Sequence, residues 1–275
     1  DDDAAGLAFV DVSTGEFACL QGDRATVESE LQRLAPAEVL AAGWTPLQGV
    51  ARTITPVPGV DVQAAVDALL AHFDTSVLDG LGLAGQRLAA AAAGLIVDYL
   101  RENQAAALGH VTRITCERPG GYMALDANTR RNLELFESLS QGSGRDPGAG
   151  ALTFLSVLDQ TKTPMGGRLL RKWVGQPLLD AEKIHGRQDC VQFFFDSAVR
   201  RGQIQALLKK VPDMERLAAR VSTAAAASPV SGTARDLVAL RSGLETMPPL
   251  REAIEGAGGL GTNLVTGLHP CSEVA

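Results

Sequence analysis

Strand-like segments are confined to the first 125 residues of this chain, and this division constrains the fold more than any other feature of the sequence. Residues 7–12 and 16–20 are strand-like and flank a turn at Gly15, which is typical of a β-hairpin. A helix capped by Thr26 is expected to end near Leu34, before a third strand at residues 38–42. Because a crossover helix between two strands allows them to be parallel, this part of the sequence predicts a mixed or parallel α/β sheet.

Two further helices and two short strands are predicted next along the chain. Apolar residues recur at helical spacing between residues 61 and 73, so an amphipathic helix should cover one face of the sheet. An alanine-rich helix is predicted at residues 86–104, and it is long enough to bridge two units. Short strands are predicted at residues 111–117 and 122–125, around a Pro-Gly-Gly turn.

The rest of the sequence has a helical pattern with short Gly or Pro breaks, which predicts a bundle of long helices. We therefore expect an α/β domain at residues 1–108 and a mainly helical, incomplete domain at residues 109–275. Because the apolar stripe of a helix needs a surface to pack on, an incomplete bundle should leave apolar side chains exposed. The helices are predicted at residues 127–139, 151–159, 164–174, 181–196, 198–210, 214–227, 234–247 and 250–255.

Composition excludes several classes of protein. With 45% hydrophobic residues, the chain can build real cores and is not disordered as a whole. Its longest uncharged apolar run, residues 88–97, is about half of the roughly 20 residues that span a bilayer, so no membrane association is expected. The sequence has no export leader, which makes the cytoplasm the expected location, and it starts without Met, which suggests a piece of a longer protein.

Charge is distributed unevenly along the chain. Residues 1–110 carry 5 basic and 15 acidic side chains, whereas residues 111–275 carry 20 basic and 17 acidic ones. An acidic first part is a poor surface for a phosphate backbone, while the balanced second part neither requires nor excludes nucleic acid. Charge alone therefore identifies no ligand.

Three glycine-containing stretches are candidates for phosphate-binding loops. Residues 80–85 match the spacing GxGxxG before a helix, but the strand that should precede them is missing, so a flexible entry to the helix is preferred. Residues 142–150 lack the Lys-Ser/Thr pair of a Walker loop. The third stretch is residues 166–168. It needs no bound phosphate, because Thr163 as N-cap and Pro164 at the first helical position already explain these residues as the start of a helix.

The most specific enzymatic hypothesis is a metal-dependent nuclease of ribonuclease H-like fold, and it depends on Asp11. A carboxylate on the first strand of an α/β domain resembles the metal-holding Asp of that fold, whose chemistry uses two magnesium ions clamped by several carboxylates. Glu38, Asp61 and Asp98 are conceivable partners, but no spacing brings them together. Asp11 can instead hydrogen-bond the turn that follows it.

Other metal and nucleic-acid sites are not predicted. The histidines lack a second ligand at i+4 spacing, and the cysteines are so widely spaced that they are interpreted as four separate thiols. Basic doublets occur on the predicted helices, but with only two Trp and two Tyr in the chain a solvated face is preferred over single-strand binding. The residues concerned are His72, His110, His185 and His269, and Cys19, Cys116, Cys190 and Cys271.

Two long stretches, residues 122–135 and 155–173, closely resemble the lever (core) domain of the MutS family, which recognises DNA mismatches. Further resemblances lie in order at residues 187–193 and 211–221 for the lever domain, and at residues 6–17 and 92–100 for the connector domain of the family. The resemblance implies a structural role for ten motif residues: Asp126, Thr129, Arg130, Arg131, Asn132, Asp159, Thr161, Thr163, Gly166 and Arg168.

This resemblance implies a ribonuclease H-like connector domain without nuclease activity, which docks MutL, followed by a helical lever domain that couples DNA binding to the ATPase. The mismatch-binding wedge, the clamp and the ATPase of the family are not in this sequence, so no catalytic, cofactor or metal residue carries over and no enzymatic activity is expected. The resemblance assigns ATP, Mg²⁺, mismatched double-stranded DNA and homodimer formation to a longer parent protein, a DNA-dependent ATPase.

The sequence departs from the family pattern at two places. Residues 142–150 and 230–234 look like insertions. Because surface loops tolerate changes in length, the packing of the flanking helices should be unaffected.

Overall fold

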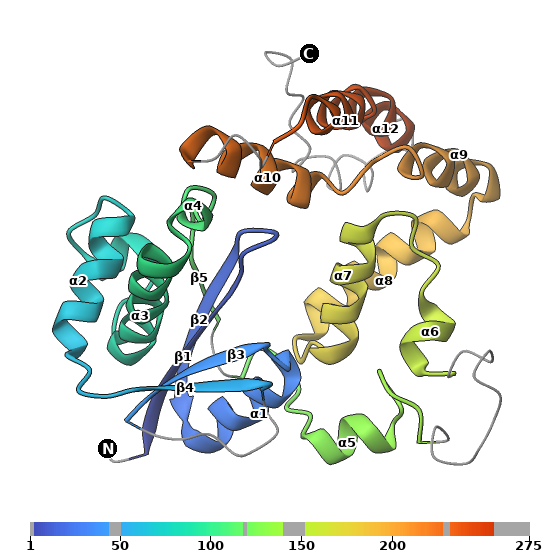
Figure 1. The fold of residues 1–275 in the computed structure, drawn as a ribbon. Coiled ribbons are helices and arrows are strands. Elements are labelled where there is room, and N and C mark those ends of the chain that lie inside the picture. Colours follow the sequence, from blue (N-terminus) through green and yellow to red (C-terminus); the bar gives the residue numbers. More distant parts are fainter. Residues whose placement is uncertain (1–2, 44–50, 118–119, 140–151, 228–231, 256–275) are drawn as a thin grey trace. The chain divides into compact units, whose positions relative to one another are not determined.

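The computed structural model describes residues 3–43, 51–117, 120–139, 152–227 and 232–255 (Figure 1). The chain divides into two compact units. The first contains Asp1–Gly120 with Ala124–Arg130 and Ser222–Ser228, and the second contains the rest of the chain. The assignment of separate functions to residues 1–108 and 109–275 remains a prediction.

The first unit is built on a hairpin of β1 (Ala4–Asp11) and β2 (Glu16–Asp23), which pair antiparallel with Leu7 opposite Leu20. Strand β5 (Thr115–Cys116) adds to β2 in parallel, giving the sheet order β1-β2-β5. The predicted hairpin is therefore confirmed, whereas the strand predicted at residues 111–117 is reduced to two residues.

A second, two-stranded sheet pairs β3 (Glu38–Ala42) with β4 (Thr53–Val57) in parallel. Strand β3 has the predicted bounds, but β4 was not predicted, and the pair forms a sheet separate from the hairpin. The predicted mixed α/β structure is therefore confirmed, but its strands form two small sheets instead of one.

Helix α1 (Arg24–Leu34) connects β2 to β3, and it begins two residues before the predicted cap. Asp23 is the N-cap, because its carboxylate accepts a hydrogen bond from the Thr26 backbone N–H at 2.7 Å. The expectation that Thr26 caps this helix was wrong: Thr26 supplies the N–H, and the acidic side chain before it supplies the acceptor.

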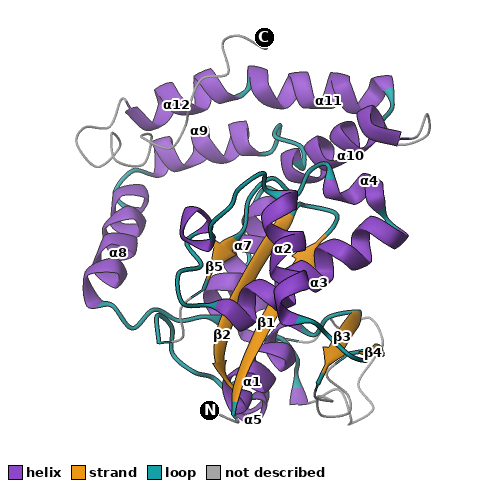
Figure 2. Cartoon of the chain, turned by 90° about the vertical axis from the view of Figure 1, so that its left-hand side faces the viewer, coloured by secondary structure: helices purple, strands orange, loops and turns teal. Residues whose placement is uncertain are grey.

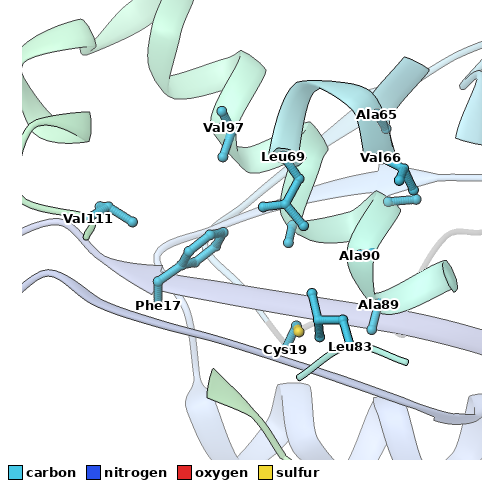
Figure 3. Packing of buried hydrophobic residues seen from close by; sticks show 12 residues of the cluster. Phe17, Cys19, Ala65, Val66, Leu69, Leu83, Ala89, Ala90, Val97 and Val111 are labelled. Carbon is cyan, nitrogen blue, oxygen red and sulfur yellow. The ribbon is translucent and has the colours of Figure 1, made fainter. Parts of the chain in front are cut away.

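Helices α2 (Val62–His72) and α3 (Arg87–Asn103) form the main core with the β1–β2 hairpin, and Figure 3 shows Leu69 of α2 and Phe17 of β2 meeting in it. Between the two helices lies the short helix η1 (Leu78–Leu81), and α4 (Ala105–Leu108) follows α3. The alanine-rich sequence of α3 allows close packing. A Cβ at Gly94 would lie 1.7 Å from the carbonyl oxygen of Ala65 in α2, so only glycine fits at this crossing.

The second part of the chain is helical, as predicted, and Figure 2 shows its elements in purple. Several predicted bounds are confirmed within one or two residues, and those of the helix predicted at residues 214–227 are confirmed at both ends. The helices are α5 (Ala127–Asn132), α6 (Phe154–Leu158), α7 (Pro164–Gly175), α8 (Ala181–Phe195), α9 (Ala198–Leu208), α10 (Met214–Ala227), α11 (Ala234–Glu245) and α12 (Met247–Glu255).

Two predicted elements near the start of this part are shorter in the structure. Helix α5 ends at Asn132 instead of residue 139, because Glu134 adopts a left-handed conformation with φ of 46°. The carbonyl of Glu134 then accepts the Phe154 N–H at 2.9 Å, which joins this segment to the start of α6. The strand predicted at residues 122–125 is only an isolated bridge between Tyr122 and Leu178.

Apolar side chains are exposed on several helices of the second unit, as expected for a bundle with unpaired faces. Val191 and Phe195 of α8 are 67% and 73% exposed, and Val199 of α9 is 74% exposed. A small core does form where Ile204 of α9 packs with Leu250 of α12. Among the described helices, none combines the length and the apolar character that crossing a membrane would need.

Candidate functional site

The first motif stretch begins α5 with a side-chain cap. The carboxylate of Asp126 accepts a hydrogen bond from the Thr129 backbone N–H at 2.6 Å. Hydrogen bonds from Thr129 favour the charged carboxylate and lower the pKa of Asp126. Asp126 and Thr129 thus fix where this helix starts, while Asn132 is its last residue.

Arg130 and Arg131 lie on opposite sides of the division between the two units, since Ala124–Arg130 belongs to the first unit and the second resumes at Arg131. Arg130 is half-buried beside the α1 residues Glu30 and Arg33. Burial lowers the pKa of Arg130, and Glu30 opposes this effect. Arg131 contributes a carbonyl that accepts the Glu134 N–H at 3.0 Å.

The second motif stretch forms a turn and a cap before α7. The carboxylate of Asp159 accepts hydrogen bonds from the backbone N–H and the hydroxyl of Thr161, at 3.0 and 2.6 Å, and these bonds lower the pKa of Asp159. Thr163 is the N-cap of α7, because its hydroxyl accepts the Gly166 N–H at 3.0 Å. With Pro164 in the first turn, the interpretation of these residues as a helix cap is confirmed.

Arg168 joins two motif stretches that are far apart in sequence. Its guanidinium donates two hydrogen bonds to the carboxylate of Asp213, with N–O distances of 2.7 and 2.8 Å, and reaches Glu215 at 2.6 Å. We call Arg168, Asp213 and Glu215 the ion clamp. It connects α7 to the start of α10, where the Arg216 N–H also donates to Asp213 at 3.3 Å.

The ion clamp is partly sheltered from water. The side chains of Arg168 and Asp213 are 30% and 18% exposed, whereas that of Glu215 is 50% exposed. Hydrogen bonds from Arg168 lower the pKa of Asp213, and the bonds that Arg168 donates to Asp213 and Glu215 raise its own pKa. A forked, charge-assisted contact of this kind fixes both distance and orientation, so it restrains the two helices against sliding and rotation.

A second ion pair ties α10 to α11. The guanidinium of Arg220 donates to the carboxylate of Asp236 at 2.7 Å, and the same carboxylate accepts the Thr233 N–H at 3.0 Å in a capping box. The bond from Arg220, together with those from Thr233, lowers the pKa of Asp236 to about 2. Neither ion pair can be predicted from local sequence signals, since each arginine and its carboxylate partner are many residues apart.

The nuclease interpretation of Asp11 is not supported. Its carboxylate accepts the backbone N–H and the hydroxyl of Ser13, at 2.8 and 2.7 Å, so it closes the hairpin turn. Glu38 is hydrogen-bonded to Thr55 and Tyr99, Asp61 caps α2, and Asp98 pairs with Arg101. In the part of the chain that the structure describes, no three metal-binding side chains form a group.

The other sequence candidates have local structural roles. The Nε2 atoms of His72 and His110 are hydrogen-bonded to the backbone carbonyl oxygens of Val111 and Val12, with N–O distances of 2.9 and 2.6 Å. In the glycine-rich stretch at residues 80–85, Gly82 and Gly85 adopt positive φ and Leu83 between them is fully buried, which is consistent with a turn into α3. Residues 142–150, His269 and Cys271 lie outside the described residues.

Comparison with known proteins gives two matches to family models along the chain. A model of MutS domain II matches residues 1–112, and a model of MutS domain III matches residues 128–264. The second match starts within α5 and covers the ion clamp.

Several bacterial relatives are similar to nearly all of the chain, and each is described as DNA mismatch repair protein MutS. The relative from Symbiobacterium thermophilum is 40% identical in an alignment 264 positions long, which covers 91% of this chain and 29% of the relative. The relative from Dehalococcoides mccartyi strain 195 is 38% identical, and the alignment covers 99% of this chain and 31% of that relative. A third, from Pelotomaculum thermopropionicum, is 36% identical, over 98% and 32% respectively. The chain thus spans about three tenths of the length of these relatives.

Proposed function

This chain belongs to the MutS family of DNA mismatch repair proteins, and we propose that it works as a non-catalytic relay within a longer protein of that family. The ion clamp is the observation that carries this proposal. A relay must move as a rigid body, because a flexible connection would absorb a displacement at one end instead of passing it on. The forked contacts of Arg168 with Asp213 and Glu215 supply such rigidity between α7 and α10.

The placement of α5 supports the same role. Its first residues, up to Arg130, belong to the α/β unit, and its last two belong to the helical unit. Backbone hydrogen bonds within such a helix restrain the chain where it passes from one unit to the next. The relay would therefore connect mismatched double-stranded DNA at one part of the longer protein with ATP hydrolysis at another.

We place nucleotide chemistry in other parts of that protein. The sequence has no Gly-Lys-Ser/Thr that would hold ATP and Mg²⁺, so no residue here is given a role in hydrolysis. Homodimer formation and a cytoplasmic location are further parts of the proposal, and they rest on family membership alone.

We assign the docking of MutL to the α/β unit. Residues 1–110 carry 15 acidic and 5 basic side chains, and such a surface favours a partner with a basic patch. Long-range attraction between such surfaces is screened by salt, so the affinity should fall as the salt concentration rises.

The test is a titration of fluorescently labelled MutL with the 275-residue chain at two salt concentrations, read by anisotropy. Amide hydrogen exchange of the saturated complex then locates the contact. We expect saturable binding that weakens with salt and slows exchange in the α/β unit. An absence of binding, or slower exchange in the helical unit alone, would contradict this assignment of the docking surface.

A further inference from the structure

Two cysteines that are 97 positions apart in sequence are neighbours in the first unit. Strands β2 and β5 pair in parallel with Cys19 directly opposite Cys116. Cys19 is completely buried, and Figure 3 shows its sulfur within the core, whereas Cys116 is partly exposed. The expectation of four separate thiols was therefore wrong for these two, because pairing of distant strands cannot be deduced from cysteine spacing.

The in-register pairing of Cys19 with Cys116 suits a disulfide. Adjacent strands in a sheet lie about 4.8 Å apart, and the Cα atoms of disulfide-bonded cysteines are usually about 4.4 to 6.8 Å apart. Residues in register on parallel strands also point to the same face of the sheet. The Cys116 side chain is within hydrogen-bonding reach of Cys19, which places the two sulfur atoms side by side.

We propose that Cys19 and Cys116 are a redox-active thiol pair, which oxidants of the peroxide class convert into a disulfide between β2 and β5. Neither cysteine belongs to the ion clamp, so the proposal is independent of the relay function.

The reaction has two steps with distinct roles for the two residues. The Cys116 thiolate attacks one oxygen of hydrogen peroxide, the O–O bond breaks, and Cys116 becomes a sulfenic acid. The hydroxide that leaves takes up the proton lost by the Cys116 thiol and is released as water. The Cys19 sulfur then attacks the Cys116 sulfur, the S–O bond breaks, and the oxygen leaves as water with the proton of Cys19. The net change is two thiols and one peroxide to one disulfide and two water molecules.

Exposure decides which cysteine reacts first. Cys116 is partly accessible to a dissolved oxidant, while Cys19 is covered by the core. Burial, reinforced by the neighbouring Cys116, raises the pKa of Cys19 to about 12. Cys19 is thus the resolving thiol, and ring closure should be the slow step, since the thiolate is the attacking form.

The disulfide would hold β5, the last strand in sequence of the β1-β2-β5 sheet, against β2. Strand β5 pairs with β2 through only two residues, supplemented by the Glu117 N–H, which donates to the Cys19 carbonyl at 2.8 Å. So short a strand can detach locally, whereas a disulfide would hold it in place. Oxidation should therefore reduce the opening of β5 without changing the fold.

The test treats the folded 275-residue chain with hydrogen peroxide, alkylates the remaining thiols, and maps the peptides by mass spectrometry. We expect a linked peptide pair that contains Cys19 and Cys116, is lighter by two hydrogen atoms than the separate peptides, and is released by dithiothreitol. The same pair should form in the double variant Cys190→Ser/Cys271→Ser, and it should be absent in Cys116→Ser.

Three results would overturn the proposal. These are complete alkylation of both cysteines after peroxide treatment, accumulation of Cys116 as sulfinic acid without a linked peptide, and linkage of Cys19 to another cysteine. Circular dichroism of each protein before oxidation shows whether it is folded, and Cys116→Ala replaces Cys116→Ser if the serine variant is not. The wild-type result decides the question even if neither variant folds.

Discussion

Asp236 should keep its negative charge to a lower pH than an ordinary aspartate. Its pKa falls from 3.8 to about 2 because the folded protein provides hydrogen bonds from Arg220 and Thr233. A carboxyl group with a lowered folded-state pKa stabilises the fold above its unfolded pKa, and this contribution is lost as the pH falls through the folded value. The free energy of unfolding should thus decline from about pH 4 to about pH 2.

Carboxyl NMR titration of wild type and Arg220→Met tests this cause. The variant should show a higher pKa for Asp236, although the bonds from Thr233 will keep it below the ordinary value. In Arg241→Met, the pKa of Asp236 should not change, because Arg241 pairs with Glu245 instead. Equal pKa values in wild type and Arg220→Met would show that Arg220 is not responsible.

Gly94 should tolerate no side chain. In Gly94→Ala the new Cβ would lie 1.7 Å from the Ala65 carbonyl oxygen, so α2 and α3 must separate. We expect a loss of about 2 to 3 kcal/mol in the free energy of unfolding, as for other overpacked cores. Urea denaturation measures this change.

Gly202→Ala provides the matched control. Gly202 lies within α9, and a Cβ added there would meet no atom within 4 Å, so alanine should stabilise the helix by up to about 1 kcal/mol. If both variants change stability equally, the close crossing of α2 and α3 is not what requires glycine at position 94.

Among the elements, α7 and α10 are the pair whose connection matters most to the proposed relay. Arg168→Met removes hydrogen bonds to two carboxylates and leaves Asp213 and Glu215 without their shared cation. The helical unit should lose about 2 kcal/mol in its free energy of unfolding. The exposed pair of Arg241 with Glu245 is the control, and Arg241→Met should cost less than about 0.5 kcal/mol.

Guanidinium chloride would mask charge interactions, so urea denaturation at low salt is the appropriate measurement. The loss in Arg168→Met should shrink as salt is added, though less than for a fully exposed pair. A stability equal to that of wild type would mean that the ion clamp does not hold α7 to α10.

The sequence predicts elements whose ends are marked by local signals. Helix α7 starts where Thr163 and Pro164 predict, and α3 follows its alanine-rich run. Strand β4 is not predictable because it is short, includes Pro56 and, among the described strands, pairs with β3 alone, so no hairpin signal accompanies it. The early end of α5 was missed because it depends on the unusual φ of Glu134.

The candidate site is less predictable than the fold, because local sequence signals reveal helix caps but not contacts between distant residues. Caps such as Asp126 and Thr163 act over three residues, so their roles can be inferred from the sequence. The partners of Arg168 lie 45 and 47 residues away, and only the tertiary fold brings them together. The resemblance at residues 211–221 indicated that this stretch matters, but not that it binds Arg168.

For the protein as a whole, the proposed relay requires that the ion clamp transmits a signal. A chain that divides into two compact units can pass on a rigid-body displacement only if each unit is stiff. If the ion clamp supplies this stiffness, its loss should weaken the coupling between DNA binding and ATP hydrolysis. The loss should affect this coupling more than it affects binding at either site.

The most direct test measures ATP turnover in a full-length MutS-family protein that contains this segment, with and without mismatched duplex. We predict that Arg168→Met retains mismatch affinity and basal turnover but loses about 1 kcal/mol of coupling, a roughly fivefold smaller response to the mismatch. Arg241→Met should respond as wild type does. An undiminished response in Arg168→Met, at a temperature where that variant is folded, would contradict the relay.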